Sequence, residues 1–345
     1  MAVRELVEQA SAFGLNVREV VRFSPLVCRE GVSLPRRHQV GPVTLYDVPR
    51  IGVGDVFSAA LTRRLLVRMG ARLDHRHIIV HMARSFYPAY RVFGGPDTRF
   101  VYIVHSNDLV QPRLRMAVEQ SDLVLARSGP LLEQLRQVTG FTADGVVFSG
   151  IPEEEICDLS RKVVAPGALR LVMACKFHPS KHIVAALEAV ARVARHAPVS
   201  VELFGDGQLR QEVDAAIARL GLGGIVKRHG FRPRHEVLAG MFRSELFLMP
   251  SAPETLGLAY LEAMAQGCVV VGHRGWGVDG IVTHGVDGFL AESHDPADIA
   301  ACLEAYRQGD RAEMRSRSHQ LVHAYTSRRA AENYASQVAR VTLAS

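Results

Sequence analysis

The sequence has no hydrophobic run close to the ~20 residues that a membrane-spanning helix requires. Charged residues occur near its start, at Arg4 and Glu5, and no continuous apolar segment follows them, which is not the pattern of a secretory signal peptide. No internal repeat or low-complexity tract is visible. These absences lead us to expect a cytoplasmic globular protein.

Cysteine is scarce, and the sequence never pairs it. The chain has five cysteines, an odd number, and no C-x-x-C or H-E-x-x-H motif. We therefore expect reduced core residues rather than disulfides or a zinc site. The five are Cys28, Cys157, Cys175, Cys268 and Cys302.

Lysine is also rare, although the chain is basic. Lysines and arginines together number 41 against 35 acidic residues, which gives a net charge of +6, and only four of the 41 are lysines. Mild basicity favours an anionic partner such as a nucleotide sugar, an anionic membrane surface or nucleic acid. Because the sequence has no interleaved aromatic and basic face and no known nucleic-acid motif, we expect no nucleic-acid partner.

Short apolar segments alternate with helical patterns along the chain, which predicts parallel sheets with crossover helices. The length of 345 residues suits two domains of similar size. We predict an N-terminal domain over residues 1–150, a linker over 151–168, a C-terminal domain over 169–310 and C-terminal helices over 311–345. Sheets of this kind bind ligands beyond the carboxyl ends of their strands. The predicted strands cover residues 77–81, 100–104, 123–126, 146–148, 170–175, 199–204, 225–228, 246–249 and 268–271.

Residues 250–267 follow a predicted buried strand and open a helix. Glu254 lies before this helix and Glu262 inside it, so at ~1.5 Å per residue their carboxylates are about 10 Å apart, the length of a diphosphate between a ribose and a sugar. Glu262 is then a candidate for binding ribose hydroxyls, and Glu254 for the donor sugar. Alternatively, the segment is an amphipathic helix with a capping acid and a surface glutamate. The free N–H groups between the two acids form an anion site, and they belong to Thr255, Leu256, Gly257 and Leu258.

The full segment resembles the E-x7-E segment of glycosyltransferase family four, in which E-A-M-A-x-G follows as it does here at residues 262–267. The resemblance implies an α/β protein of the GT-B fold, in which two doubly wound Rossmann-like domains face a cleft and the C-terminal helices cross back to the first domain. It implies that a hexosyl-type group moves, with retention, from a nucleotide diphosphate sugar to an acceptor that the sequence does not name. It implies no metal and no cofactor beside this donor.

A second loop, residues 175–181, holds Lys176 and Lys181 at a strand end and a helix start. Cations at a helix N-terminus are unfavourable by ~0.3–1 kcal/mol when exposed, and a bound diphosphate removes that penalty. Two solvated surface lysines are the alternative. The loop resembles the family's G-R-L-x-x-x-K, with Lys176 in place of the arginine and with Cys175 and His182 in place of glycines. The resemblance implies that both lysines stabilise the charge of the leaving phosphate.

Two further segments resemble donor-binding loops of the family. Gly205 and Gly207 match its G-x-G-P-x turn, although a G-D-G sequence alone is usually only a turn. Phe231 and Arg232 follow the next strand, where the family holds the nucleobase, so we expect Phe231 to pack on a base and Arg232 to reach the phosphate or the base. A core phenylalanine and a solvated arginine are the alternative.

The glycine-rich residues 272–280 resemble the family's x-x-G-G-x-x-E loop, with Asp279 near the acidic position. This loop carries Trp276, the only tryptophan, which is a candidate for stacking on a sugar or for packing. In the first half of the chain, His105 ends a strand and resembles the histidine that the family places near the donor sugar. We expect it to line the reaction centre. Ser128 matches another family position and is a candidate either for binding the acceptor or for closing the turn.

His81 and Arg84 end another predicted strand and are further acceptor candidates. Family members begin with a strand and a glycine-rich loop, whereas here residues 5–14 already predict the first helix. We therefore expect the opening strand to be absent.

Four arginines repeat at i, i+4 spacing, so in a helix they would form a basic ridge. Such a ridge either contacts an anionic membrane or is a solvated face. The four arginines are Arg64, Arg68, Arg72 and Arg76.

Two other functions remain open at this stage. One is a non-catalytic GT-B protein that binds a ligand or partner, which the missing opening loop favours. The other is a glycoside phosphorylase or nucleotide-sugar epimerase of the same fold.

Overall fold

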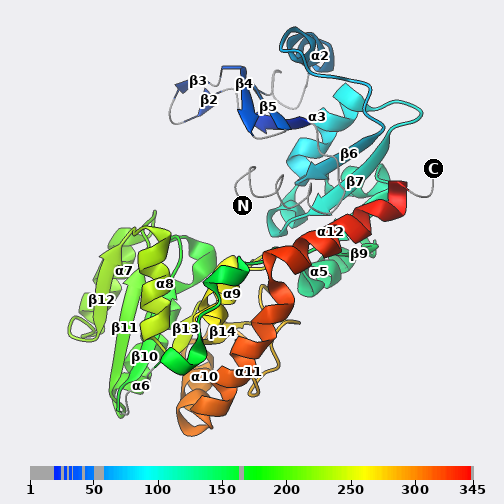
Figure 1. Cartoon of the computed structure of the whole chain (residues 1–345). Coiled ribbons are helices and arrows are strands. Elements are labelled where there is room, and N and C mark those ends of the chain that lie inside the picture. The colour runs from blue at the N-terminus through cyan, green and yellow to red at the C-terminus, as the bar shows by residue number, and fades with distance from the viewer. Residues whose placement is uncertain are drawn as a thin grey trace. The chain divides into compact units, whose positions relative to one another are not determined.

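The computed structural model describes residues 19–24, 27–28, 31–32, 34–40, 43–49, 58–162 and 167–342. Two compact units make up the chain (Figure 1). Unit 1 consists of Met1–Arg127, Leu132–Val147 and Ala331–Ser345, and unit 2 consists of Ser128–Leu131 and Phe148–Ala330. The helix predicted over residues 5–14 lies outside the described residues.

Unit 2 is built on a six-stranded sheet in which all neighbouring strands are parallel. Its order is β12-β11-β10-β13-β14-β15, which runs 3-2-1-4-5-6 along the chain and is a doubly wound arrangement. The direction of winding reverses between β10 and β13. The strands are β10 (Leu169–Ala174), β11 (Val199–Phe204), β12 (Val226–Gly230), β13 (Leu246–Leu248), β14 (Val269–His273) and β15 (Gly288–Ala291).

Helices cover both faces of this sheet because successive strand residues point to opposite sides. In β10, Leu171 and Met173 are buried in one core with residues of α6, α7 and α10, and Val172 is buried in another with residues of α8 and α9. Because these strands are buried on both faces, their sequences are continuous apolar runs. They were therefore predictable although apolar and polar residues do not alternate along them. The helices are α6 (Ile183–Ala194), α7 (Arg210–Arg219), α8 (Arg234–Arg243), α9 (Leu258–Ala265), α10 (Pro296–Gln308) and α11 (Arg311–Leu321), with the short helices η2 (Glu153–Glu155), η3 (Leu159–Arg161), η4 (Pro179–Lys181) and η5 (Val322–Tyr325).

The described strands of unit 1 form two larger sheets and one hairpin. One sheet has the order β1-β5-β4, the other is parallel with the order β6-β7-β8-β9, and β2 pairs with β3. The predicted absence of an opening strand concerns residues before β1, outside the described ranges. The strands are β1 (Glu19–Ser24), β2 (Val27–Cys28), β3 (Gly31–Val32), β4 (Arg36–Val40), β5 (Val43–Pro49), β6 (His77–His81), β7 (Arg99–Val104), β8 (Leu123–Ala126) and β9 (Gly145–Val146).

Most sequence-predicted elements are present at nearly the predicted bounds. The strands expected over residues 77–81, 123–126 and 199–204 coincide with β6, β8 and β11. The strand expected over residues 146–148 is shorter, because β9 is the edge strand and pairs with β8 at only two positions. The remaining helices are α2 (Ala59–Arg68), α3 (Ala83–Phe93), α4 (Leu114–Glu119), α5 (Gly129–Thr139) and α12 (Ser327–Thr342), with η1 (Ser106–Val110).

The predicted ridge of four arginines is wrong. Helix α2 ends at Arg68, and Gly70 follows in the left-handed region with φ at 83°. Gly70 reverses the chain there, because glycine adopts this conformation without the strain of a Cβ atom. Only Arg64 and Arg68 therefore lie on the helix, whereas Arg72 pairs with Asp74 at 2.8 Å and Arg76 directly precedes β6.

The C-terminal helices divide at a different point from the predicted boundary at residue 311. Helix α11 belongs to unit 2, where the Ser318 hydroxyl donates to the Cys268 carbonyl oxygen at 3.0 Å. Helix α12 packs through Tyr334 and Val338 with buried residues of β7 and β8 in unit 1. Burial of Ser318 and His319 keeps α11 on the second unit, so the chain enters unit 1 only within α12.

Four cysteines have described side chains, and all four are free thiols. Cys268 and Cys302 are buried, and burial raises the pKa of Cys175 and of Cys302 to about 12. These thiols stay protonated and unreactive at neutral pH. The prediction of unpaired cysteines is confirmed for these four, and the prediction of core positions is confirmed for Cys268 and Cys302, whereas Cys157 and Cys175 are half-buried.

Candidate functional site

The loops after β10 and β13 meet where the winding of the unit 2 sheet reverses. β10 and β13 are parallel neighbours, paired at Leu171 with Leu246 and at Val172 with Phe247, so their carboxyl ends lie at the same edge. In doubly wound sheets, ligands bind in the crevice at such a reversal. The loop after β10 carries Lys176 and Lys181, and the loop after β13 carries Glu254. The topology therefore brings two predicted site segments together that lie more than 70 positions apart in the chain.

Lys181 and Glu254 form an ion pair. The ammonium of Lys181 also lies 3.2 Å from the Ser251 hydroxyl, which is itself 3.1 Å from Glu254 Oε2. Both charged side chains are mostly shielded from solvent, with exposed fractions of 19% for Lys181 and 13% for Glu254. A shielded pair of this kind places a cation and a hydrogen-bond acceptor side by side at the edge of the sheet. Ser251, which sequence reasoning did not select, links the two.

The backbone N–H groups before α9 are only partly available as an anion site. Glu254 Oε1 accepts a hydrogen bond of 3.0 Å from the Thr255 N–H, so the prediction that this group is free is wrong. A carboxylate just before a helix caps its own following N–H groups. Gly257, with φ at 77°, directs the chain into α9 at Leu258. The N–H groups of Leu256, Gly257 and Leu258 remain the predicted anion donors.

Glu262 lies in α9 and is held by Arg234, the first residue of α8. Arg234 donates from Nη2 and Nε to Glu262 Oε1, at 2.8 and 3.0 Å. The same guanidinium group also pairs with Glu155, with a distance of 2.6 Å from Arg234 Nη2 to Glu155 Oε2. Both hydrogen bonds from Arg234 to the Glu262 carboxylate end on Oε1, so Oε2 takes no part in this contact. The signal that singled out Lys181, a cation in the first turn of a helix, would also have found Arg234.

Gly205 and Gly207 hold the turn after β11 against the loop after β10. A Cβ atom on Gly205 would lie 1.9 Å from the Cys175 carbonyl oxygen, and one on Gly207 would lie 2.5 Å from that of Phe177. In this close approach, the Phe177 N–H donates to the Asp206 carbonyl oxygen at 2.9 Å. The glycines therefore fix the position of the lysine loop, a structural reason for their presence that stands beside the predicted donor contact.

Replacing Gly205 by alanine is expected to destabilise unit 2 by roughly 2–4 kcal/mol, because the new Cβ atom meets backbone rather than a movable side chain and φ is 124°. Urea unfolding measures this change. Gly223→Ala is the control, because nothing lies within 4 Å of a Cβ atom there. Equal unfolding midpoints for both variants would contradict the role of Gly205.

Phe231 is exposed rather than part of the core. Its exposed fraction is 84%, the highest among the large hydrophobic side chains described, so the core alternative is excluded. Arg232 lies next to it and donates to the His229 carbonyl oxygen at 2.9 Å. The His229 ring in turn stacks on Phe204 with centroids 4.3 Å apart. An aromatic face that is left in water beside a guanidinium suits a flat ring, which gains stacking energy there.

The glycine-rich loop around Trp276 touches the Glu254 loop. The Gly277 N–H donates to the Glu254 carbonyl oxygen at 3.1 Å, and a Cβ atom on Gly277 would lie 2.9 Å from the Glu254 side chain. Asp279 accepts from the Gly275 N–H at 2.6 Å and so stabilises its own loop. Trp276 is half-buried. This loop therefore supports the Glu254 backbone. Asp279, the acid of the predicted motif, stabilises the conformation of the loop itself.

In unit 1, His105 is hydrogen-bonded to His81, and His81 to Tyr334 of α12. The His81 Nδ1 to His105 Nε2 distance and the His81 Nε2 to Tyr334 Oη distance are both 3.3 Å. Burial, followed by the charges of Arg127 and Arg84, lowers the pKa of His105 to about 4. Both imidazoles are therefore neutral at pH 7, as the prediction for His105 requires, since burial also lowers the pKa of His81. Sequence reasoning missed Tyr334, which lies 253 positions from His81.

Asp108 fixes the backbone of this histidine loop. Its buried carboxylate accepts hydrogen bonds of 2.9 Å from the N–H groups of His105 and Ala83 and from the Tyr102 hydroxyl.

Ser128 is buried in unit 2, where its hydroxyl accepts a hydrogen bond from the Leu131 N–H at 3.4 Å and so caps the start of α5. Of the two roles considered for Ser128, the structure therefore gives evidence for local capping.

Within the described ranges, no helix is both long and apolar enough to cross a bilayer. The same ranges contain no group of three or more histidine, cysteine or acidic side chains placed to hold a metal ion. Lys176 is exposed, in contrast to Lys181.

Residues 161–320 match the family Glycosyl transferases group 1. The chain is 29% identical over 229 residues to the amylovoran biosynthesis glycosyltransferase AmsK of Erwinia amylovora, and this alignment covers 64% of this chain and 55% of AmsK. It is 25% identical over 278 residues to the N-acetyl-alpha-D-glucosaminyl L-malate synthase of Bacillus anthracis, and this alignment covers 76% of this chain and 72% of that protein. The chain thus spans little more than half the length of AmsK.

The fold is that of a solved GT-B glycosyltransferase. The crystal structure of Anabaena HepE in complex with UDP and glucose aligns with a TM-score of 0.67 and 20% identity, over 88% of this chain and 87% of that one. The expected α/β fold of the GT-B type is therefore confirmed, with the doubly wound strand order described for unit 2.

Proposed function

We propose that this chain transfers a hexosyl-type group from a nucleotide diphosphate sugar, with retention at the anomeric carbon, because its residues 161–320 match the group 1 glycosyltransferases and it has the GT-B fold. The observation that carries the proposal is the meeting of Lys181 and Glu254 at the reversal point of the unit 2 sheet, with Glu262 held in the adjoining helix. A cation, a sugar-binding carboxylate and a ribose-binding carboxylate are the groups that such a donor requires.

In the proposed reaction, the bond between the anomeric carbon and the diphosphate oxygen breaks, and a bond from an acceptor hydroxyl oxygen forms on the same face. The hydroxyl proton passes to the leaving diphosphate. Lys181, the N–H groups before α9 and Lys176 stabilise the charge that develops on this leaving group, so no metal ion is needed. Glu254 orients the donor sugar, and the neutral His105 lines the reaction centre.

Lys181 exchanges partners when the donor binds. In the structure its ammonium is held by Glu254 and Ser251. A diphosphate at the same edge offers the ammonium a second anion and leaves the Glu254 carboxylate to accept sugar hydroxyls. The ion pair thus keeps both groups ordered before the donor arrives, which lowers the entropic cost of binding.

Nucleotide release from a panel of donors tests the proposal. The protein is incubated with UDP-, GDP- and ADP-sugars and an acceptor pool, with and without EDTA. UDP-glucose is the first donor to examine, because the HepE structure holds UDP and glucose. Release of a nucleoside diphosphate that EDTA does not reduce is expected. Nucleotide binding without release from any donor would instead favour the non-catalytic alternative, and release of a sugar 1-phosphate in phosphate buffer would favour a phosphorylase.

Phe231 is proposed to stack on the nucleobase. Phe231→Ala should weaken nucleotide affinity by about 5- to 50-fold, since stacking on an aromatic ring contributes ~1–3 kcal/mol. Folding should be unchanged, because the side chain is 84% exposed. Calorimetric titration measures the affinity, with Phe231→Trp as the control that keeps an aromatic face. An alanine variant that binds as tightly as the wild type would remove Phe231 from the site.

The acceptor is proposed to be part of a growing glycan or a lipid-linked sugar, as the name of AmsK, an amylovoran biosynthesis glycosyltransferase, suggests for that relative. Helix α2 offers a surface for peripheral membrane contact, because Arg64 and Arg68 share its exposed side with Leu61 and Val67, which are 47% and 57% exposed. Cosedimentation with anionic vesicles tests this contact, and equal binding of wild type and Arg64→Glu/Arg68→Glu would argue against it.

A further inference from the structure

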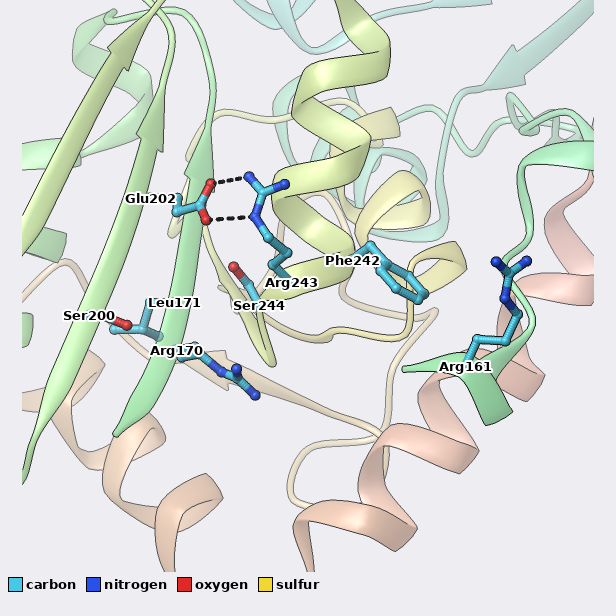
Figure 2. A pocket seen from close by; sticks show the side chains of 8 residues that line it. All are labelled: Arg161, Arg170, Leu171, Ser200, Glu202, Phe242, Arg243 and Ser244. Carbon is cyan, nitrogen blue, oxygen red and sulfur yellow. Dashed lines mark hydrogen bonds and ion pairs between the residues drawn. The ribbon is translucent and has the colours of Figure 1, made fainter. Parts of the chain in front are cut away.

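Unit 2 has polar side chains at both ends of its sheet. At the amino ends of the strands, Arg170 of β10 lines a cavity, and the Glu202 carboxylate in its wall accepts hydrogen bonds from Arg243 at 2.7 and 3.1 Å (Figure 2). Lys181 and Glu254 follow the carboxyl ends of β10 and β13, so this cavity does not belong to the proposed donor site. A second group of polar side chains lies at the carboxyl ends, on the same side as the donor site.

Three histidines at the carboxyl ends form a stack of rings, which we call the histidine stack. His182 directly follows Lys181, His273 is the last residue of β14, and His294 lies in the loop between β15 and α10. The ring centroids of His182 and His294 are 3.4 Å apart with an interplanar angle of 15°, and those of His294 and His273 are 4.2 Å apart at 30°. His294 is therefore the middle ring, and the stack joins the loops that follow β10, β14 and β15.

His182 ties the loop of Lys181 to the loop of Glu254. The His182 Nε2 atom lies 3.1 Å from the Ala252 carbonyl oxygen. On the other side of Lys181, the Ser180 carbonyl oxygen accepts a hydrogen bond from the Ala252 N–H at 2.9 Å. The residues before and after Lys181 are thus both fastened to the segment that precedes Glu254. The place of His182 therefore restricts where the Lys181 ammonium lies.

The backbone of His182 has a conformation that favours glycine. Its φ is 46°, in the left-handed region, and His182 replaces a glycine of the family motif. A residue with a Cβ atom is strained in this region and persists there only where its surroundings hold it. The contacts that hold His182 are those of its imidazole, with the Ala252 carbonyl and with the His294 ring. The benefit of a histidine at this position must therefore come from the ring.

The histidine stack is favourable only while its rings are neutral. Burial, followed by the charges of His182 and His273, lowers the pKa of His294 to about 4. Burial also lowers the pKa of His182, although its contact with the Ala252 carbonyl acts in the opposite direction. His294 Nε2 is buried and has no hydrogen-bond partner among the described residues, so a protonated ring would hold a donor without an acceptor there.

The other charged groups of these loops do not offset protonation of the stack. Within the described ranges, no carboxylate pairs with His182, His273 or His294, because the acids nearby pair with cations or accept from backbone N–H groups. His178, which shares the loop of Lys181, is bonded to Ser180 instead. These neighbouring groups are Lys181 with Glu254, Arg274 with Glu292 and Asp279, and Asp295 and Asp298 at the start of α10.

We propose that the histidine stack positions Lys181 for the donor diphosphate while its rings are neutral and releases the Lys181 loop when they are protonated. The proposal rests on the proposed function, since it takes Lys181 as the cation that meets the diphosphate. The three histidines are positioning residues, because they act through Lys181. Their effect should be present above about pH 6.5 and should be lost as the pH falls toward 4, since histidines with a lowered pKa resist protonation only in the folded state.

Calorimetric titration with UDP, at about pH 7.5 and about pH 5.5, tests the proposal. His294→Ala should weaken UDP binding at the higher pH by about 2- to 10-fold, because one ring contact that supports His182 is lost. His294→Phe keeps a flat ring and should restore most of this loss. The fall in affinity at the lower pH should be larger for the wild type than for His294→Phe, because a phenyl ring carries no charge and attracts neighbouring cations.

The protonation of UDP itself is common to all variants, so it cancels in these comparisons. His196→Ala is the control, because His196 is an exposed histidine elsewhere in unit 2 that pairs with Glu304 at 2.7 Å. It should match the wild type at both pH values. UDP binding that is the same in the wild type and His294→Ala at both pH values would overturn the proposal.

Urea unfolding at the same two pH values tests the stack without a nucleotide. The unfolding midpoint should fall more for the wild type than for His294→Phe as the pH is lowered, because the unfolded wild type takes up one more proton that the stack resists. Equal falls would also overturn the proposal. A wild type that shows this difference and binds no nucleoside diphosphate would contradict the proposed function instead. If His294→Ala does not fold, the comparison of the wild type with His294→Phe still decides.

Discussion

Replacing Lys181 by alanine is expected to lower kcat/KM for sugar transfer by about 100- to 1,000-fold, the effect of removing one group that stabilises developing charge in a transition state. Lys181 is the shielded cation of the site, with 19% of its side chain exposed, and it is held between Glu254 and Ser251. A cation in this position loses little freedom when a diphosphate departs against it. Steady-state release of nucleotide measures the change.

Two comparisons separate a catalytic role of Lys181 from a structural one. Lys227→Ala removes an exposed lysine of the same unit and should leave activity unchanged. In Lys181→Ala, the shielded Glu254 carboxylate loses its partner, which should lower the melting temperature. Adding Glu254→Gln removes that unpaired charge and should restore the melting temperature but not the activity. Recovery of both would mean that Lys181 only neutralises Glu254.

Replacing Glu262 by alanine is expected to weaken nucleotide binding by about 10- to 100-fold, because hydrogen bonds from ribose hydroxyls to a charged carboxylate are lost. The loss should be much smaller for the 2′,3′-dideoxy nucleotide, which lacks the hydroxyls that Glu262 is proposed to bind. Calorimetric titration of both nucleotides provides the measurement.

The matched control for this variant is Glu188→Ala. Glu188 also lies in a helix of unit 2 and pairs with an arginine, Arg219, at 2.7 Å. Its removal costs a comparable ion pair and should leave nucleotide affinity unchanged. If Glu262→Ala binds both nucleotides as the wild type does, the assignment of Glu262 to the ribose fails and its role is limited to its contact with Arg234.

The elements of unit 2 were predictable because each depends on local sequence. Strands such as β11 are short apolar runs, and the helices between them carry a helical apolar period. The order of the strands is not a local property, since β13 pairs with β10 although two other strands separate them along the chain. The contact of Lys181 with Glu254 depends on that order, so sequence reasoning found both residues without predicting that they touch.

Ion pairs between distant segments were the main part of the site that remained invisible. Arg234 connects Glu262, 28 positions away, to Glu155, 79 positions away, and no periodicity in the sequence encodes such a link. The ridge of arginines failed for a local reason instead, because a single glycine, Gly70, ended the helix before its third member. The i, i+4 spacing of the arginines therefore predicted a longer helix than the left-handed conformation of Gly70 allows.

Trp276 gives this protein a built-in optical probe. It is the only tryptophan in the chain, and its neighbour Gly277 is hydrogen-bonded to the Glu254 backbone. Tryptophan emission therefore comes from one half-buried loop beside the proposed donor site, without background from any other indole. Donor titrations can be followed by fluorescence in unlabelled protein, and the alanine, glutamine and glutamate variants described above keep the same single reporter, whereas Phe231→Trp adds a second indole.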